Sequence, residues 1–358
     1  MSKLKTVIES IGSLDKDIMS KAQDRLDNLT KPQGSLGRLE ELAKLVVGIT
    51  GKENPSLKNK VIFTFAGDHG VTEEGISAFP KEVTPQMVYN FLRGGAGINV
   101  LANYVGVRVR VADLGVAVDL ESHPGLIIKK INYGTKNMVK GPAMTKEEAE
   151  KSIEAGIEIF EEEFKKGIDI VGTGDMGIGN TTPSSAITAV FTGKPVEQLT
   201  GKGTGIDEGG LKNKIEVIKR AIALNKPDAK DAIDVLSKVG GFEIGGLSGV
   251  ILAAASNRVP VVIDGFISGA AALVAYQMEP KVKDFLIAGH CSVESGHRVI
   301  LDHIGLTPVL DLDFRLGEGT GACLAMGVVE AGIKIMTEMA TFKNANVSEK
   351  REQERIRQ

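Results

Sequence analysis

One glutamate, Glu318, lies between two glycines in the run PVLDLDFRLGEGTG, residues 308–321. The run begins with a short apolar segment, 308–312, and a long helical pattern follows at 322–339. A carboxylate at a strand-to-helix turn is held by stiff elements and approached from an open side, which suits a general base. An acidic residue that complements a helix N-terminus gives the same pattern without a function. This run alone leaves both interpretations open.

A second motif is the glycine-rich run GTGDMGIGNTTPSSA, residues 172–186. Its four glycines allow sharp turns that expose backbone N–H groups, and Pro183 suits the first turn of a following helix. Such a loop before a helix binds anions. The run lacks the closing Lys-Ser/Thr of a P-loop, and it does not occupy the usual place of a dinucleotide fingerprint. We interpret it as a site for a phosphate monoester, with a tight structural turn as the alternative.

Another glycine-rich loop, 200–210, leads into a helix that carries Lys212 and Lys214. One of these lysines could reach a phosphate as a point charge, although a solvated lysine is the commoner outcome on a helix surface. The histidines do not have the spacing of a zinc site, so no metal centre is expected. Neither Cys291 nor Cys323 lies in a recognisable nucleophile motif.

Length and charge exclude several classes of protein. The chain has 358 residues and a net charge of −3, which argues against binding to a nucleic-acid backbone. No run of eighteen apolar residues is present, so we expect no membrane span. Two isolated cysteines predict neither a disulfide framework nor a structural zinc site, and they favour a reduced, cytoplasmic setting.

Six short apolar or β-branched runs alternate with helical patterns. Such runs are typical of strands buried on both faces, and the alternation predicts an α/β fold with a doubly wound, mainly parallel, Rossmann-like sheet. The clearest helix is 145–166, which begins with a capping box at Thr145 and Glu148 and ends at Gly167. The six expected strands are 61–66, 107–112, 168–172, 259–264, 284–288 and 308–312.

Helical residues at both ends of the chain predict a small accessory domain. We expect residues 1–58 to be helical and part of this domain, and residues 59–320 to form the catalytic α/β domain. Residues 321–342 would form a C-terminal helix that joins the small domain, and the charged tail 343–358 would be frayed. Polar or glycine-rich residues follow every expected strand, where open parallel sheets bind their ligands.

Long motifs carry a resemblance to a known family. The chain resembles nicotinate-nucleotide–dimethylbenzimidazole phosphoribosyltransferases over roughly residues 20–340. The matching runs are LTKPQGSLGRLEELA, GDHGV, EVTPQMV, GGAGINVLA, GTGDMGIGNTTPSSA, KGTGID, GGFEIGGLSG, GHCSVESGH and DFRLGEGTG.

This resemblance implies an enzyme that moves the 5-phosphoribosyl group of nicotinate mononucleotide onto 5,6-dimethylbenzimidazole. The products would be nicotinate and α-ribazole 5′-phosphate, which supplies the lower ligand in cobalamin assembly. The resemblance also implies a homodimer that uses no metal or redox cofactor. It places the catalytic glutamate at Glu318 and a second acidic residue at Asp175, where other members carry Glu. The implied phosphate contacts are Gly177, Ile178, Gly179, Lys214 and Ser292, and the implied base pocket is Pro80, Gln86, Met87 and Leu316.

The chemistry of this reaction agrees with a single carboxylate. Nicotinate leaves from a pyridinium N-glycoside, so its departure neutralises a charge and needs no general acid. The incoming benzimidazole has to lose its N–H proton, which Glu318 would accept. A single in-line displacement predicts inversion, from β-nucleotide to α-product. Burial would raise the pKa of this carboxyl and a helix N-terminus would lower it.

Other functions remain open at this stage. A nucleoside phosphorylase or nucleotidase would use the same anion loop with phosphate or water as acceptor. A relative within the family could use adenine, a different benzimidazole or a phenol as acceptor. A nucleotide-binding protein without catalytic activity would be expected to lack the carboxylate at position 318, and the glutamate is present.

Overall fold

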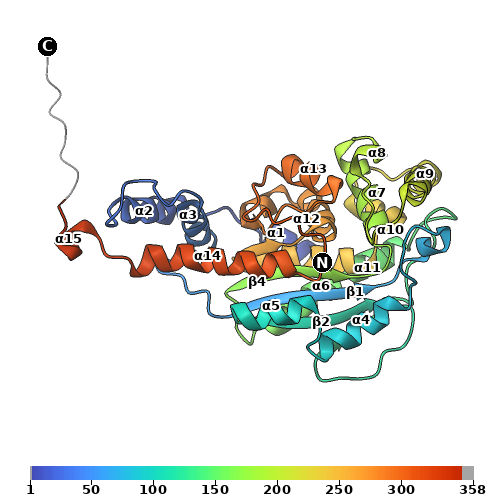
Figure 1. The fold of residues 1–358 in the computed structure, drawn as a ribbon, viewed down its shortest axis with the longest axis horizontal. Coiled ribbons are helices and arrows are strands. Elements are labelled where there is room, and N and C mark those ends of the chain that lie inside the picture. The colour runs from blue at the N-terminus through green and yellow to red at the C-terminus, as the bar shows by residue number, and fades with distance from the viewer. Residues whose placement is uncertain (1, 349–358) are drawn as a thin grey trace, which may run out of the picture. The chain divides into compact units, whose positions relative to one another are not determined.

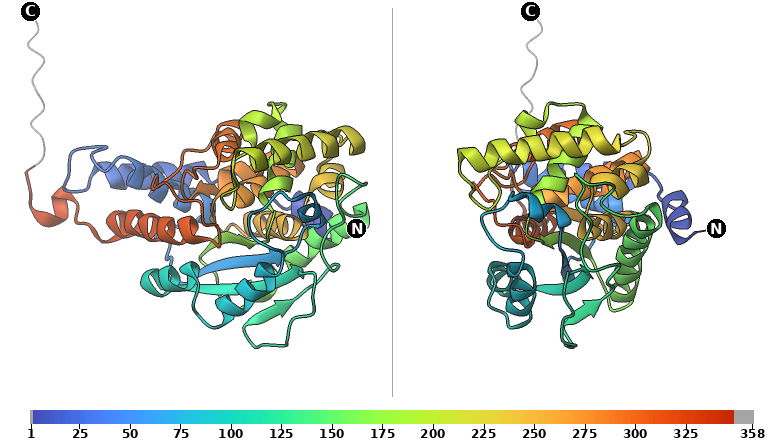
Figure 2. Two further views of the ribbon diagram at one scale, coloured as in Figure 1. Left: turned by 45° about the vertical axis from the view of Figure 1, so that its right-hand side comes forward. Right: turned by 90° about the vertical axis from the view of Figure 1, so that its right-hand side faces the viewer.

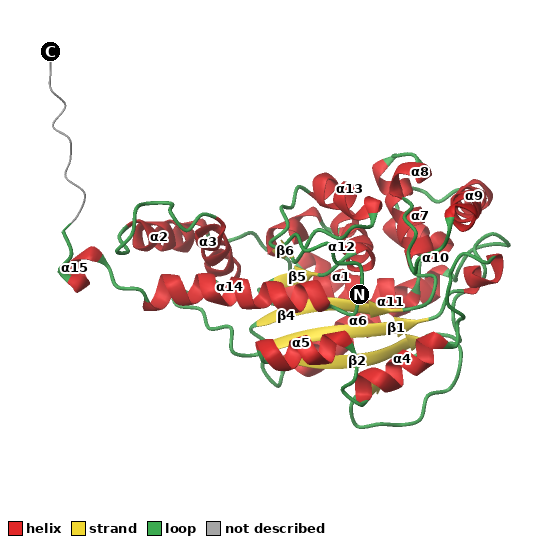
Figure 3. Ribbon diagram, viewed as in Figure 1, coloured by secondary structure: helices red, strands yellow, loops and turns green. Residues whose placement is uncertain are grey.

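The computed structural model describes residues 2–348. Its centre is an all-parallel sheet whose strand order is β3-β2-β1-β4-β5-β6 (Figure 3). This confirms the expected doubly wound α/β fold, because the strand order reverses direction between β1 and β4. The strands are β1 Lys60–Gly67, β2 Val107–Gly115, β3 Leu126–Ile128, β4 Ile170–Met176, β5 Val261–Ile263 and β6 Leu286–Ala288.

One expected strand is wrong, and one strand was missed. The segment 308–312 forms only an isolated bridge, between Leu310 and His290, and lies beside the loop that follows β6. Its Leu312 is 51% exposed, which shows that an apolar run here does not enter the buried sheet. The missed strand, β3, has only three residues and pairs with β2 at the edge of the sheet. Such a short strand carries no periodicity that distinguishes it from a loop.

Helices cover both faces of the sheet (Figure 2). Helices α4 (Val83–Leu92) and α5 (Gly97–Val105) lie on one face, and α6 (Lys146–Phe164) and α11 (Phe242–Ser256) lie on the other. The predicted capping box of α6 is confirmed at Thr145 and Glu148. Helices α6 and α11 approach so closely that a Cβ atom at Gly156 would lie 1.9 Å from the Gly246 carbonyl oxygen.

Several further helices belong to the same compact unit as the sheet (Figure 1). They are the 3-10 helices η1 (Gly70–Glu74) and η2 (Pro280–Phe285) and the α-helices α7 (Thr181–Thr192), α8 (Val196–Leu199), α9 (Glu208–Asn225), α10 (Ala232–Val239), α12 (Phe266–Met278) and α13 (Ser295–Ile304).

The chain divides into two compact units. The first unit contains residues 2–13 and 57–327, and the second contains residues 14–56 and 328–348. These bounds differ from the expected ones, because α1 (Lys3–Glu9) groups with the sheet and α14 (Thr320–Glu338) contributes to both units. Of the tail expected at 343–358, residues 349–358 lie outside the described part of the chain.

The second unit consists of α2 (Lys16–Asp27), α3 (Arg38–Thr50), the later part of α14 and α15 (Phe342–Ala345). The Arg25 guanidinium donates to the carbonyl oxygen of Thr337 (Nη2–O 3.1 Å), which satisfies the last turn of α14. Lys31 and Glu40 form a buried ion pair with Nζ and Oε1 2.8 Å apart.

Helix α14 is long and apolar enough to cross a membrane by length and composition alone. However, 56% of its most apolar window is buried inside the protein. Because the core helix of a soluble protein passes the same test, this helix is weak evidence for a membrane span.

Candidate active site

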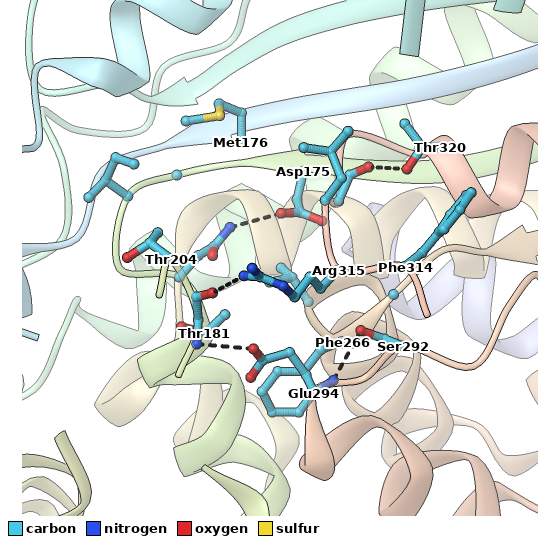
Figure 4. A pocket seen from close by; sticks show the side chains of 18 of the residues that line it. Asp175, Met176, Thr181, Thr204, Phe266, Ser292, Glu294, Phe314, Arg315 and Thr320 are labelled. Carbon is cyan, nitrogen blue, oxygen red and sulfur yellow. Dashed lines mark hydrogen bonds between the residues drawn. The ribbon is translucent and has the colours of Figure 1, made fainter. Parts of the chain in front are cut away.

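A cavity of about 930 Å³ lies within the first unit, beyond the carboxyl ends of β4, β5 and β6 (Figure 4). This is the edge at which open parallel sheets bind ligands. Most of its wall is apolar, with a smaller set of polar and charged groups. The wall is made by 175–181 after β4, 203–204, 265–267 after β5, residues between 290 and 294 after β6, 313–317, the N-terminal half of α5 and residues between 76 and 79.

Glu318 lies next to the residues that line this cavity and is not itself one of them. Its carboxylate is turned toward the N-terminus of α5, where Oε2 accepts the Ile98 N–H (N–O 3.0 Å). The residue is 5% exposed, and its neighbours Gly97, Gly317 and Thr320 line the cavity. Glu318 therefore does complement a helix N-terminus, as one of the two interpretations predicted. The helix concerned is α5 rather than α14, which follows Glu318 in the chain.

The electrostatic surroundings of Glu318 favour the protonated carboxyl. Burial raises the pKa of Glu318, the backbone N–H groups of α5 oppose this effect, and the negative charge of Asp264 raises the pKa further. The net shift is upward, so burial outweighs the helix N-terminus. A raised pKa brings a carboxyl closer to the proton affinity that a general base needs near neutral pH.

Asp175, the second acidic residue implied by the resemblance, lines the same cavity at the end of β4. Its Oδ2 accepts a hydrogen bond from Asn180 Nδ2 (2.9 Å), and its Oδ1 has no hydrogen-bond partner among the described residues. Burial raises the pKa of Asp175 well above its ordinary value, and repulsion by Asp264 and Glu243 adds to this effect. Asp175 thus favours the neutral acid, which can donate a proton.

The predicted anion loop lies at the cavity wall immediately before α7. A Cβ atom at Gly177 would lie 2.3 Å from the Gly67 carbonyl oxygen, so only glycine fits against the end of β1. Gly179 has a positive φ of 88°. The Ile178 N–H donates to Thr84 Oγ1 (3.1 Å), so this amide is used within the protein. The loop is thereby held in place from α4, which carries Thr84.

Lys214 is buried rather than solvated, so the common outcome for a helix lysine does not apply here. It is 1% exposed, and its Nζ donates to Thr181 Oγ1 (2.6 Å), a residue that lines the cavity. Burial lowers the pKa of Lys214 to about 8, although the Glu294 carboxylate opposes the shift. Lys212, two residues away, is exposed.

Ser292 lines the cavity on the side opposite Thr181 (Figure 4). Its backbone N–H donates to His297 Nδ1 (3.0 Å), and its hydroxyl oxygen accepts the Glu294 N–H (3.3 Å). Burial lowers the pKa of His297 to about 3, so the imidazole is neutral and its Nδ1 acts as an acceptor. The loop after β6 is fixed by these contacts.

The four residues of the expected base pocket are not brought together. Leu316 lines the cavity and is 60% exposed. Pro80 and Gln86 are exposed, Met87 is half-buried on α4, and none of these three lies in the cavity wall. The apolar wall comes instead from Phe79, Val100, Leu101, Met176, Phe266 and Phe314.

Arg315 is a cavity residue that the sequence reasoning missed. Its guanidinium extends across the cavity and donates to the Gly203 carbonyl oxygen (Nη1–O 3.2 Å; Figure 4). The adjacent Thr204 Oγ1 accepts the Ala78 N–H (3.0 Å), so the loop at 203–204 is held from two sides. The sequence could have indicated Arg315, because it lies three residues before Glu318 in the run 308–321.

Comparison with known proteins places this architecture in a family. A family model described as phosphoribosyltransferase matches residues 11–347. A nicotinate-nucleotide–dimethylbenzimidazole phosphoribosyltransferase from Geobacter sulfurreducens is 60% identical over 98% of this chain and 99% of its own length. A protein of the same name from Desulforudis audaxviator is 59% identical over the same shares of the two chains.

A solved structure agrees with these relatives. The crystal structure of a phosphoribosyltransferase of this name from Thermus thermophilus superposes with a TM-score of 0.90 at 44% identity, over 94% of this chain and all of the other. The chain therefore belongs to the nicotinate-nucleotide–dimethylbenzimidazole phosphoribosyltransferase family, a family of pentosyltransferases.

Proposed function

We propose that this chain transfers the 5-phosphoribosyl group of nicotinate mononucleotide to 5,6-dimethylbenzimidazole, releasing nicotinate and forming α-ribazole 5′-phosphate for cobalamin assembly. The names of its relatives support these substrates. The single observation that carries the mechanism is the buried Glu318 carboxyl of raised pKa, whose neighbours Gly317 and Thr320 line the cavity.

Glu318 serves as the general base in this proposal. The benzimidazole would lie against Leu316 and the N-terminus of α5, with its N–H directed at the Glu318 carboxylate. Proton transfer of this kind contributes on the order of 10²–10⁴-fold to the rate. Nicotinate leaves without a proton because its departure neutralises the pyridinium nitrogen. A single displacement, without a covalent intermediate, then inverts the configuration at C1′.

The 5′-phosphate would bind at the other end of the cavity. The loop Gly177–Gly179 precedes α7, and Thr181, which contacts the Lys214 ammonium, begins this helix. Helix N-termini and buried cations both favour a dianion. Ser292 adds a hydroxyl on the facing loop. Asp175 contacts Asn180 on one side and the Glu318 N–H on the other, and its neutral acid would donate a hydrogen bond to a ribose hydroxyl oxygen.

We also propose a cytoplasmic homodimer in which helices from both ends of the chain form a small second domain. The grouping of residues 14–56 with 328–348 supports this division, at bounds that differ from the expected ones.

The decisive experiment mixes the purified protein with nicotinate mononucleotide and 5,6-dimethylbenzimidazole and follows both products by chromatography. We expect nicotinate and α-ribazole 5′-phosphate in equal amounts. The variant Glu318→Gln should bind nicotinate mononucleotide with unchanged affinity and lose most of its turnover. Nicotinate release without the riboside would indicate a hydrolase, and near-normal turnover by the variant would exclude Glu318 as the base. If neither product forms, a panel of other bases and phenols tests the alternative acceptors.

A further inference from the structure

The backbone of Glu318 is fixed by two neighbouring strands of the sheet. Thr64, in β1, donates its hydroxyl to the Glu318 carbonyl oxygen (Oγ1–O 2.9 Å). The Asp175 carbonyl oxygen, in β4, accepts the Glu318 N–H (N–O 3.3 Å). In addition, a Cβ atom at Gly174 would lie 2.3 Å from the Glu318 carbonyl oxygen, so β4 packs directly against this peptide.

A third strand contributes through Asp264, the residue that follows β5. Asp264 is fully buried, and its two oxygens accept different amides of the chain just after Glu318. Oδ2 accepts the Gly319 N–H (3.2 Å), and Oδ1 accepts the Ala322 N–H (2.9 Å). Burial raises the pKa of Asp264 overall, although His290 and these backbone donors oppose the shift. Asp264 is therefore a buried carboxyl that holds the first turn of α14.

The backbone that these contacts hold, around Glu318, has an unusual conformation. Three consecutive residues have positive φ angles, Gly317 (79°), Glu318 (64°) and Gly319 (97°). Glycine adopts this region freely, whereas a residue with a Cβ atom loses about 1–2 kcal/mol there. Such a conformation persists where the surrounding contacts determine it, and it is found at functional sites.

We propose that Asp264 is a positioning residue for the Glu318 carboxylate, because its two oxygens fix the left-handed turn through the amides of Gly319 and Ala322. This inference rests on the proposed function, in which Glu318 is the general base. It adds a residue that touches neither substrate and determines both the direction and the proton affinity of the base.

The groups around Glu318 also support an electrostatic effect of Asp264 on the pKa of Glu318. After burial, which is the largest cause, the charge of Asp264 is the other influence that raises the pKa of Glu318, against the amides of α5. His290, after β6, lies near Asp264, with Nε2 and Oδ1 3.7 Å apart. The further titratable groups that face this pair are Asp175 from β4, Glu243 from α11 and Cys323 from α14.

Two nearly isosteric variants separate the two roles of Asp264. Asp264→Asn removes the charge and one acceptor oxygen. Thr64→Val removes a different hydrogen bond to Glu318 and leaves every charge in place. Misplacement of a catalytic group by about 1 Å lowers turnover about 10²-fold, so we expect both variants to lose at least about tenfold in kcat. Asp302→Asn, which removes an exposed carboxylate of α13, is the control for a change in net charge.

The test is the pH dependence of kcat/KM for the transferase reaction. Because the charge of Asp264 raises the pKa of Glu318, Asp264→Asn should move the acid limb of the profile to lower pH. Thr64→Val and Asp302→Asn should leave the limb where it is. An unshifted limb in Asp264→Asn, or an equal shift in Thr64→Val, would overturn the assignment.

A second measurement does not depend on catalysis. In a double-mutant cycle at pH 8, Glu318→Gln should increase the urea midpoint more in the wild-type background than in the Asp264→Asn background, because the two carboxylates repel each other. If the two substitutions change the urea midpoint additively, Asp264 and Glu318 are not coupled and the electrostatic effect is refuted. If the wild-type protein made no riboside phosphate, the proposed function would fail, and the cycle would still decide whether Asp264 and Glu318 interact.

Discussion

Replacing Lys214 by methionine should stabilise the protein at neutral pH, although it removes a proposed substrate contact. Burial lowers the pKa of Lys214 from the ordinary 10.5 to about 8. That difference corresponds to about 3 kcal/mol of free energy by which the native state disfavours the ammonium. The side chain is 1% exposed, so solvent screening does not reduce this value. The lost hydrogen bond to Thr181 offsets about 1 kcal/mol of it, which leaves a net gain of about 2 kcal/mol.

The stability gain of Lys214→Met should decrease as the pH rises. Below pH 8 Lys214 is protonated in both the native and the unfolded chain, so the full penalty of a buried ammonium is present in the wild-type protein. Between pH 8 and 10.5 the unfolded chain binds more protons than the native protein, so wild-type stability rises through this range. The advantage of Lys214→Met should therefore be largest at pH 7 and be lost before pH 10.5, because wild-type stability rises by about 3 kcal/mol over this range, more than the net gain of about 2 kcal/mol.

Urea denaturation of the wild-type protein and Lys214→Met at pH 7 and pH 10 measures this effect. Lys212→Met is the matched control, because Lys212 is an exposed lysine of the same helix, and its replacement should leave the urea midpoint almost unchanged at both pH values. An equal or lower midpoint for Lys214→Met at pH 7 would refute the reasoning. So would a gain that does not change between the two pH values.

Three further predictions concern the acidic end of the site and its backbone. Burial raises the pKa of Glu318, so the native protein loses stability as pH rises from 4.5 through the pKa of the native carboxyl. Glu318→Gln should thus have a higher Tm than the wild-type protein at pH 8 and an equal Tm at pH 4, as followed by calorimetry. Asp175→Asn should also raise the Tm at pH 8 but not at pH 4, because burial raises the pKa of Asp175 as well. Gly174→Ala should unfold the protein or reduce its stability by about 2–5 kcal/mol, since its Cβ atom would lie 2.3 Å from the Glu318 carbonyl oxygen. Gly141→Ala, whose Cβ atom would meet nothing within 4 Å, should change the urea midpoint little.

The sequence predicts the fold well where buried strands are long. The runs at 61–66, 107–112 and 168–172 correspond to β1, β2 and β4, because each strand is continuous and buried on both faces. The runs at 259–264 and 284–288 also correspond to strands, β5 and the edge strand β6. Prediction fails at the other edge of the sheet and at one apolar segment outside it. Strand β3 is too short to show a period, and the segment 308–312 is apolar without being paired in the sheet.

The sequence also predicts some parts of the candidate site and not others. The motif residues Asp175, Gly177 and Ser292 line the cavity because each follows a strand, and parallel strands bring their carboxyl ends to one edge. The burial of Lys214 could not be read from its helix, since the groups that cover it come from residues 181 and 201. The apolar wall was also unpredictable, because Phe266 begins α12 and Phe314 lies in the loop before α14, and their meeting depends on tertiary structure.

Buried carboxyls and a buried lysine lie around the cavity, and both kinds of group bear on the proposed substrate. Nicotinate mononucleotide carries a pyridinium at C1′ and a phosphate dianion at C5′. The carboxyls of Glu318, Asp175 and Asp264 interact with one another, and the Lys214 ammonium contacts Thr181 and is influenced by the Glu294 carboxylate. Each group is unfavourable in the empty protein, because burial disfavours its charged form. Substrate binding would place the ring cation near the carboxyls and the phosphate near the lysine, which relieves both penalties together. The positive charge that develops at C1′ as nicotinate leaves would be stabilised by the same carboxyls. If the proposed function holds, the buried groups that destabilise the free protein would also favour the transition state of the transfer.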